Sequence, residues 1–218
     1  MSSHKRPTAC VAALIVAGLS TASAQAALPE FVPGAGVPYT ATSGMSMLET
    51  ASKAKVKCAA DTATGVTTGP KTLTAEITFT GCVTGTAPCT SPGAAAGEIV
   101  TTTLSGLLGY TVNPEVKEVG IDLSSPTGAP IAEYVCGPAL LGVVTGSVIG
   151  QLTPVNTLLV PPKHFTLKFK QKKGMQEITH LFGEPVDVLG TTFAGPTILT
   201  GLKSTEKIKF AAAGEVKA

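Results

Sequence analysis

Apolar and polar residues alternate strictly from residue 72 to residue 80 (TLTAEITFT). The odd-numbered positions from Leu73 to Phe79 are apolar, and the even-numbered ones are Thr or Glu. This period of two predicts a half-buried β-strand whose apolar side faces a core. The dipeptide Gly69-Pro70 before the run and Gly81 after it are typical of strand ends.

Shorter versions of this pattern recur along the chain, separated by Pro- and Gly-rich turns. The further strands that they predict cover residues 53–58, 98–110, 116–123, 131–136, 142–152, 164–170, 175–181, 186–189 and 198–210. Short strands at this spacing predict one all-β, mainly antiparallel domain over residues 45–218, built as a sandwich or as an irregular closed barrel. The Pro- and Gly-rich residues 27–44 are expected to form an extended lead-in.

The first 26 residues have the features of a secretory signal peptide. A short basic segment precedes an apolar run from about Ala9 to Leu19, and Ala-x-Ala sites follow at Ala24 and Ala26. Because the run is too short to span a membrane, we expect cleavage near Ala26 and a secreted or envelope-associated chain without a transmembrane segment. The formal charge of +2 falls to zero when the two basic residues of the signal leave, so no nucleic-acid partner is expected.

Four cysteines remain once the signal and its Cys10 are removed, namely Cys58, Cys82, Cys89 and Cys136. An even number of cysteines in an oxidising compartment predicts two structural disulfides. We expect Cys82 to pair with Cys89 across one Pro- and Gly-rich loop. Cys58 would then pair with Cys136, since each ends an extended segment. The chain has no CxxC and no histidine near these cysteines, so no metal site is predicted.

Several segments of the chain resemble a group of small secreted proteins of high-GC Gram-positive, actinobacterial bacteria. The segments are FTGC, TSPGAAAGEIVTTTLSGLLGY, AEYVCG and GSVIGQLTPVN, and the resemblance covers roughly residues 55–170. These proteins are uncharacterised. The resemblance therefore implies an extracellular β-rich protein and supplies no catalytic residue.

The most concentrated charge lies in the segment PKHFTLKFKQKKG, residues 162–174. Its lysines are Lys163, Lys168, Lys170, Lys172 and Lys173. Alternation places Phe165, Leu167 and Phe169 inward and the lysines of the strand outward, which also discourages edge-to-edge pairing. The sharper interpretation is a binding patch for an anionic cell-envelope polymer or for another extracellular protein. Lys207 and Lys209 would extend the patch if the last strand lies alongside.

Catalytic chemistry is weakly indicated. The motifs GxSxG and HExxH and the EF-hand loop are absent from the sequence. Five acids lie near consecutive predicted strands, namely Glu98, Glu115, Glu118, Asp122 and Glu133, and alternation places Asp122 on the solvent side. His164 and His180 flank a predicted hairpin. We therefore predict a non-catalytic binding module without a cofactor. The alternatives are an extracellular hydrolase or isomerase with an acidic and lysine-bearing cleft, and a small-ligand carrier barrel suggested by GVVTGSVIG.

Overall fold

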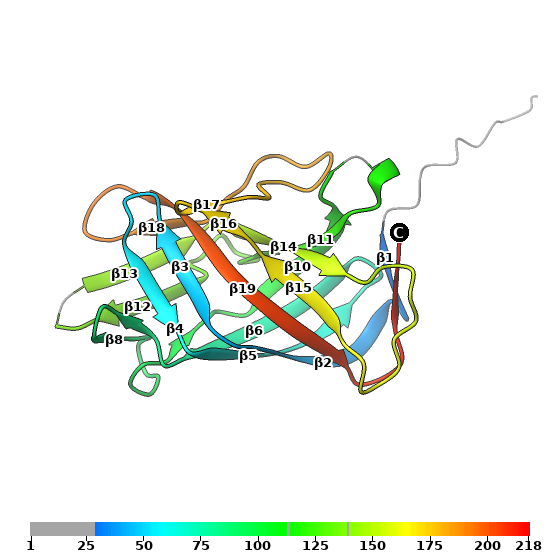
Figure 1. Ribbon diagram of the computed structural model, residues 1–218, viewed down its shortest axis with the longest axis horizontal. Helices are drawn as coiled ribbons and strands as arrows, with labels where there is room; N and C mark the ends of the chain where they lie inside the picture. Colours follow the sequence, from blue (N-terminus) through cyan, green and yellow to red (C-terminus); the bar gives the residue numbers. More distant parts are fainter. Residues whose placement is uncertain (1–28, 113, 139) are drawn as a thin grey trace, which may run out of the picture.

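The computed structural model describes residues 29–112, 114–138 and 140–218 (Figure 1). The signal peptide predicted for residues 1–26, with Cys10, lies outside the described residues. The strands pair antiparallel throughout one large sheet and two small ones. This arrangement confirms the predicted all-β, antiparallel fold, and it takes the form of a closed barrel rather than a sandwich.

Eight strands form the barrel, which lies toward the right of Figure 1. In spatial order they are β2 (Ala35–Ser43), β5 (Ala60–Thr68), β6 (Thr72–Thr80), β10 (Leu104–Tyr110), β11 (Val119–Ser124), β14 (Ser147–Thr153), β15 (Phe165–Phe169) and β19 (Ile198–Phe210). The pairing of β15 with β19 closes the sheet on itself. A closed sheet leaves no free edge along these strands.

A second ring of strands adjoins the barrel at the left of Figure 1 and shares β19 with it. From β19 it passes through β3 (Ser46–Thr50), β4 (Lys55–Cys58), β7 (Val83–Thr84), β8 (Ala87–Thr90), β12 (Ala132–Cys136), β13 (Leu140–Thr145) and β18 (Gly190–Thr192), and back to β19. The contact between β4 and β7 is a single residue pair. The first half of β19 therefore belongs to this second ring and its last half to the barrel.

Alternation along β19 explains how one strand serves both rings. From residue 203 onward its odd positions are exposed and its even positions are buried or half-buried. The inward side chains Ile208 and Phe210 join the barrel core. Phe210 makes edge-to-face contacts with Phe31, Tyr39 and Phe165, with ring centroids 5.5 to 6.1 Å apart. This aromatic cluster fills one end of the barrel.

The remaining elements are short. They are the pair β1 (Glu30–Val32) and β20 (Glu215–Lys217), the hairpin β16 (Gln171–Lys172) and β17 (Met175–Gln176), the strand β9 (Ile99–Val100) beside β6, and the 3₁₀ turn η1 (Pro114–Val116). The segment expected to be a lead-in is extended but contributes to the domain. It forms β1 and the barrel strand β2, whose Tyr39 and Ala41 are buried.

Two predicted strands are divided in the structure. The run 142–152 becomes β13 and β14, because Gly146 adopts a φ of 89° and turns the chain between them. The run 98–110 becomes β9 and β10, which pair with different parts of β6. The strand predicted for residues 175–181 is limited to β17, and that predicted for 186–189 is replaced by β18. The spans 72–80 and 198–210 are confirmed as β6 and β19.

All four described cysteines form disulfides, but the predicted pairing is wrong. The bonds are Cys58–Cys82 and Cys89–Cys136. The cysteines form a row across four neighbouring strands or strand ends, in which the Cys89 amide donates to the Cys82 carbonyl and Cys136 lies opposite Cys89. A bond between the two middle cysteines, Cys82 and Cys89, would leave Cys58 and Cys136 at the ends of the row. These two are about three strand spacings, roughly 14 Å, apart, which is beyond the reach of a disulfide.

Candidate functional site

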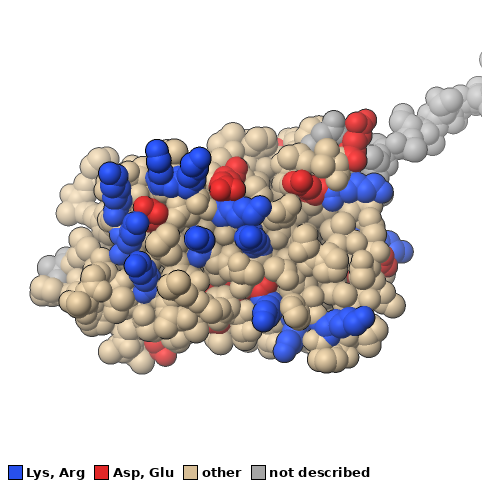
Figure 2. Space-filling view, viewed as in Figure 1, with Lys and Arg blue, Asp and Glu red and all other residues tan. Residues whose placement is uncertain are grey.

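Lysine side chains gather on one face of the molecule, over β3, β4, β15, β16 and β19 (Figure 2). We call this surface the lysine face. It consists of Lys55, Lys57, Lys168, Lys170, Lys172, Lys173, Lys203, Lys207 and Lys209. The lysines of β4, β15 and β19 point outward because they alternate with buried residues of the two cores.

The centre of the lysine face is the contact between β15 and β19. Lys168 lies opposite the neutral Thr205, so Lys203 and Lys207 are its diagonal neighbours on β19, with Cα separations of about 7–8 Å. All three lysines are exposed. From the sequence, Lys207 and Lys209 are expected to extend the patch if the last strand lies beside residues 164–170. In the structure β19 pairs with β15 and carries both lysines on its outer side.

A second row of lysines crosses the other half of β19. Met47 of β3 lies opposite both Lys57 on β4 and Lys203 on β19. These two lysines are therefore separated by two strand spacings, about 10 Å. Lys55 lies nearby on β4 and forms an ion pair with Glu49. Its Nζ lies 3.2 Å from Glu49 Oε1. The lysine face thus continues from the barrel onto the second ring.

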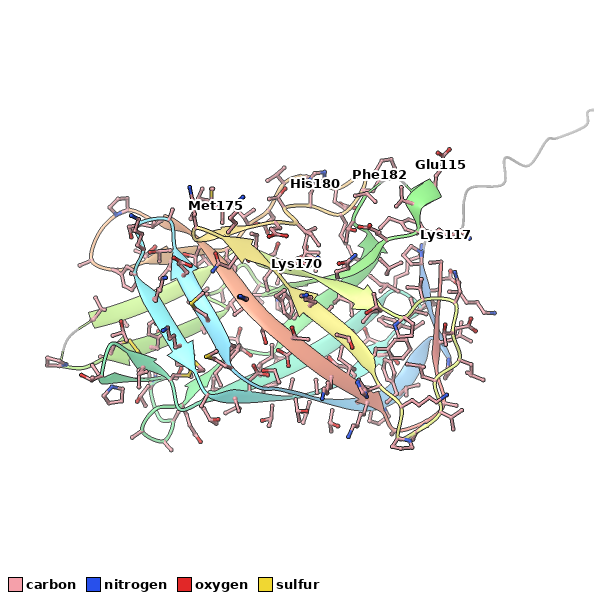
Figure 3. The ribbon with its side chains drawn as sticks, viewed as in Figure 1. Glu115, Lys117, Lys170, Met175, His180 and Phe182 are labelled. Atoms are coloured by element: carbon pink, nitrogen blue, oxygen red, sulfur yellow. A yellow bond between two sulfur atoms is a disulfide. The ribbon has the colours of Figure 1, made fainter. Side chains whose placement is uncertain are left out.

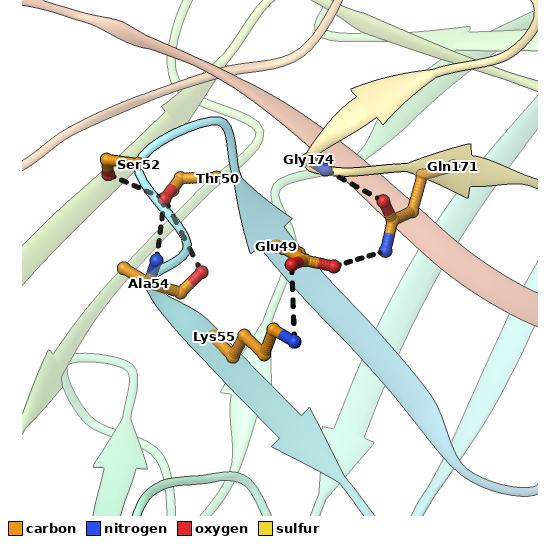
Figure 4. Close-up of polar contacts among 7 residues, drawn as sticks. All are labelled: Glu49, Thr50, Ser52, Ala54, Lys55, Gln171 and Gly174. Atoms are coloured by element: carbon orange, nitrogen blue, oxygen red, sulfur yellow. Dashed lines mark hydrogen bonds and ion pairs between the residues drawn. The ribbon is translucent and has the colours of Figure 1, made fainter.

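The β16–β17 hairpin adds Lys172 and Lys173, and Gln171 holds it against β3 (Figure 4). The Gln171 amide nitrogen donates to Glu49 Oε2 at 2.8 Å, and its amide oxygen accepts from the Gly174 backbone N–H at 2.9 Å. The hydrogen bond from Gln171 and the charge of Lys55 hold the pKa of Glu49 below its usual value. This carboxylate therefore remains an anchor for the hairpin rather than a free negative charge.

The two remaining predicted lysines differ in their settings. Lys170, labelled in Figure 3, is half-buried, and its Nζ donates to Gln151 Oε1 on β14 at 3.2 Å. Lys163 is exposed in the loop before β15, where its backbone N–H donates to the Val160 carbonyl. Lys170 thus lies between β15 and β16, whereas Lys163 lies in the loop before β15.

The sequence interpretation missed a pair of acids buried inside the barrel, Asp61 of β5 and Glu206 of β19. They are 1% and 7% exposed. Ser43 donates to Asp61 Oδ2, and Ser204 donates to Glu206 Oε1. The alternation that places Ile208 and Phe210 inward also places Glu206 inward. The inward position of this acid could therefore have been predicted from the sequence.

The two buried carboxyls influence each other's charge. Asp61 Oδ1 and Glu206 Oε2 have no hydrogen-bond partner among the described residues. Burial, followed by the hydrogen bond and the negative charge of Asp61, raises the pKa of Glu206 to about 8. The pair lies at the end of the barrel opposite the aromatic cluster, where Glu206 lines a cavity of about 30 Å³.

The five acids considered for catalysis are not gathered into one site. Among the described residues, no group of three or more His, Cys, Asp or Glu side chains is placed to hold a metal ion. Asp122 faces outward from the barrel but is half-buried rather than solvated. Burial, opposed by the nearby Ser147 hydroxyl and reinforced by the charges of Asp187 and Glu184, raises its pKa to about 6. His180 is exposed near Phe182 at the upper edge of Figure 3.

The second ring encloses an apolar cavity of about 70 Å³. Its wall combines inward side chains of β3, β4, β12, β13 and β19 with the end of β6. An empty cavity of this size costs about 1.7 kcal/mol of stability at roughly 24 cal/mol per Å³. The molecule therefore combines a charged outer face, a buried acid pair and an apolar cavity.

Comparisons with protein-family models, with curated proteins and with solved structures found no match to this chain. In the part of the chain that the structure describes, there is also no helix of the length and hydropathy needed to cross a membrane. Any statement about function therefore rests on the surface and the interior described above.

Proposed function

We propose that the protein is a secreted or envelope-associated, non-catalytic module that binds an anionic polymer of the cell envelope through its lysine face. The observation that carries the proposal is the cluster of Lys168, Lys203 and Lys207 on the paired strands β15 and β19. Like charges at this spacing repel one another, and an anionic ligand would relieve that repulsion.

The type of cation and its support favour a repeating polyanion. Lysine presents a compact point charge on a flexible stem, whereas arginine is the residue suited to planar, bidentate recognition. The only arginine of the chain is Arg6. Lysines spread over adjoining strands suit a ligand whose charges repeat along its length. The two disulfides support an oxidising compartment outside the cytosol.

The positions of the acids support a non-catalytic role. Asp61 and Glu206 are buried inside the barrel, where each is hydrogen-bonded by a serine. A catalytic acid or base must come within hydrogen-bond reach of its substrate. This pair is better placed to organise the barrel interior than to meet a polymer on the surface.

The proposal is tested with the mature, oxidised chain and an immobilised poly(glycerol phosphate) polymer. We expect affinity to fall as the salt concentration rises, because screening weakens contacts between exposed charges. Replacing Lys168, Lys203 and Lys207 with Gln should weaken binding on the order of 100-fold, at roughly 1 kcal/mol per lysine near an anionic surface.

The matched control is the triple variant of Lys71, Lys117 and Lys217 to Gln. These lysines lie outside the lysine face, and their removal changes the net charge by the same amount. The control should bind nearly as well as the parent chain. An equal loss in both triple variants would mean that net charge rather than the lysine face drives binding, and salt-independent binding would reject the proposal.

A further inference from the structure

The apolar cavity of the second ring has the lining of a ligand site. Its wall is formed by Ser46, Leu48, Val56, Cys58, Ile77, Phe79, Ile99, Thr101, Leu104, Ile131, Ala132, Tyr134, Val144, Val148, Leu189 and Leu202. None of these side chains carries a charge at neutral pH. The volume of about 70 Å³ is roughly half that of an engineered apolar cavity of about 150 Å³ that binds benzene or xenon.

Tyr134 of β12 supplies a hydrogen-bonding group in this wall. The residue is 1% exposed, and no described residue hydrogen-bonds its hydroxyl. Its ring lies across Gly142 on β13: a Cβ at Gly142 would come within 2.5 Å of Tyr134 Cζ. Because burial raises the pKa of Tyr134 to about 12, the hydroxyl keeps its proton and is available as a donor.

Tyr134 also separates the cavity from the surface. A depression of about 10 Å³ shares Leu48, Val56 and Tyr134 with the cavity wall. Its other lining residues include Ala54 and Lys55, which are exposed in and after the β3–β4 turn. The side chains of Leu48, Val56 and Tyr134 therefore lie between the cavity and this depression.

We propose that this cavity binds a small, neutral molecule with a hydrocarbon body and one oxygen acceptor, whose oxygen accepts a hydrogen bond from Tyr134. The uncharged wall disfavours anions and cations, because burying an unpaired charge is far more costly than burying an apolar group. The volume of about 70 Å³ limits the ligand to about three heavy atoms, on the scale of a 150 Å³ cavity that takes the six carbons of benzene. This site is independent of the lysine face.

Methyl NMR titration of the oxidised chain tests the proposal with two probes, dissolved xenon and dimethyl ether. Xenon reports whether an apolar atom enters, and the ether adds the acceptor oxygen. Both should shift the methyl signals of Leu48, Val56 and Leu202. Tyr134→Phe keeps the ring and removes the donor, so it should leave xenon binding unchanged and weaken dimethyl ether binding by about tenfold.

A filling variant and its control complete the test. Ala132→Leu places extra methyl groups in the cavity and should abolish binding of both probes, whereas Ala96→Leu adds the same bulk at an exposed loop position and should preserve it. If Ala132→Leu fails to fold, Val148→Ile fills part of the same cavity. Unchanged dimethyl ether affinity in Tyr134→Phe, or lining methyl signals that neither probe shifts, would overturn the proposal.

Discussion

At the scale of single residues, Glu206 is the least expected feature of the barrel. It lies between Lys207 and Thr205, which face solvent, yet its own side chain points inward at Asp61. Two carboxylates in a low-dielectric interior repel each other strongly, so one of them keeps its proton. The hydroxyls of Ser43 and Ser204 each donate to one oxygen of the pair, whereas Asp61 Oδ1 and Glu206 Oε2 have no partner among the described residues.

The proton held by this pair makes stability depend on pH. The folded pKa of Glu206, about 8, lies above its unfolded value of about 4.3. The folded state therefore binds more protons than the unfolded state between these values, and the contribution of Glu206 to stability is fully present below about pH 4.3 and is lost as pH rises through about 8. We expect the melting temperature to fall across this range by several degrees, as followed by calorimetry.

The matched variant is Glu206→Gln, whose amide donates a hydrogen bond to Asp61 without needing a proton. It should flatten the decrease of the melting temperature between pH 5 and pH 8 and should be more stable than the parent chain at pH 8. Parallel pH profiles for the two proteins would show that the pair does not govern this dependence.

At the scale of elements, the β16–β17 hairpin is too short to be stable alone and relies on contacts with the neighbouring strands. Its two-residue turn, Lys173–Gly174, has positive φ angles of 54° and 75°, as a type I′ hairpin turn requires. Gln171 connects the turn to Glu49 on β3, and Gln176 accepts from the Leu202 backbone N–H on β19 at 2.7 Å. The hairpin is thereby attached to β3 and to the first half of β19.

Replacing Gln171 with Ala removes the bridge between β3 and the hairpin turn. We expect hydrogen exchange of the Gly174 amide to become about tenfold faster, since one hydrogen bond is lost at that group. The pKa of Glu49 should rise toward its ordinary value in an NMR titration, because the hydrogen bond that lowers it is gone. Lys172→Ala is the control and should leave both readouts unchanged; an unaltered Gly174 exchange rate in Gln171→Ala would contradict the bridging role.

At the scale of the whole molecule, the barrel and the second ring are joined by β19 and are stabilised differently. Both disulfides connect elements of the second ring, between the ends of β4 and β7 and between β8 and β12. The barrel has a closed hydrogen-bonded sheet and an aromatic cluster instead. Because β19 runs through both rings, neither is complete without it, and we expect them to unfold together.

The disulfides close segments with sequence separations of 24 and 47 residues. On the chain-entropy model they contribute about 3.5 and about 4 kcal/mol, respectively. Replacing Cys89 and Cys136 with Ala should therefore lower the free energy of unfolding slightly more than replacing Cys58 and Cys82. Urea titrations followed by two probes, one in each ring, measure both effects. Two separate transitions in the oxidised chain would contradict the shared role of β19.

The lysine face shows how far sequence reasoning reaches toward a candidate site. Alternation correctly placed Lys168 outward and Phe165, Leu167 and Phe169 inward. Whether β19 would lie beside this strand depended on the closing of the barrel, which no local pattern encodes. The lysines of β4 were not part of the predicted patch, because the pairing of β4 with β3 and of β3 with β19 brings residues distant in sequence together.

The sequence by itself determined the all-β class, the strand spans of β6 and β19 and the side of each strand that faces a core. These features follow from the period of two, which acts between neighbouring residues. Only the tertiary structure decided the closed barrel, the disulfide pairing and the meeting of Asp61 with Glu206. Each of these depends on which strands become neighbours, and strand order is set by packing and closure over the whole chain rather than by any local pattern.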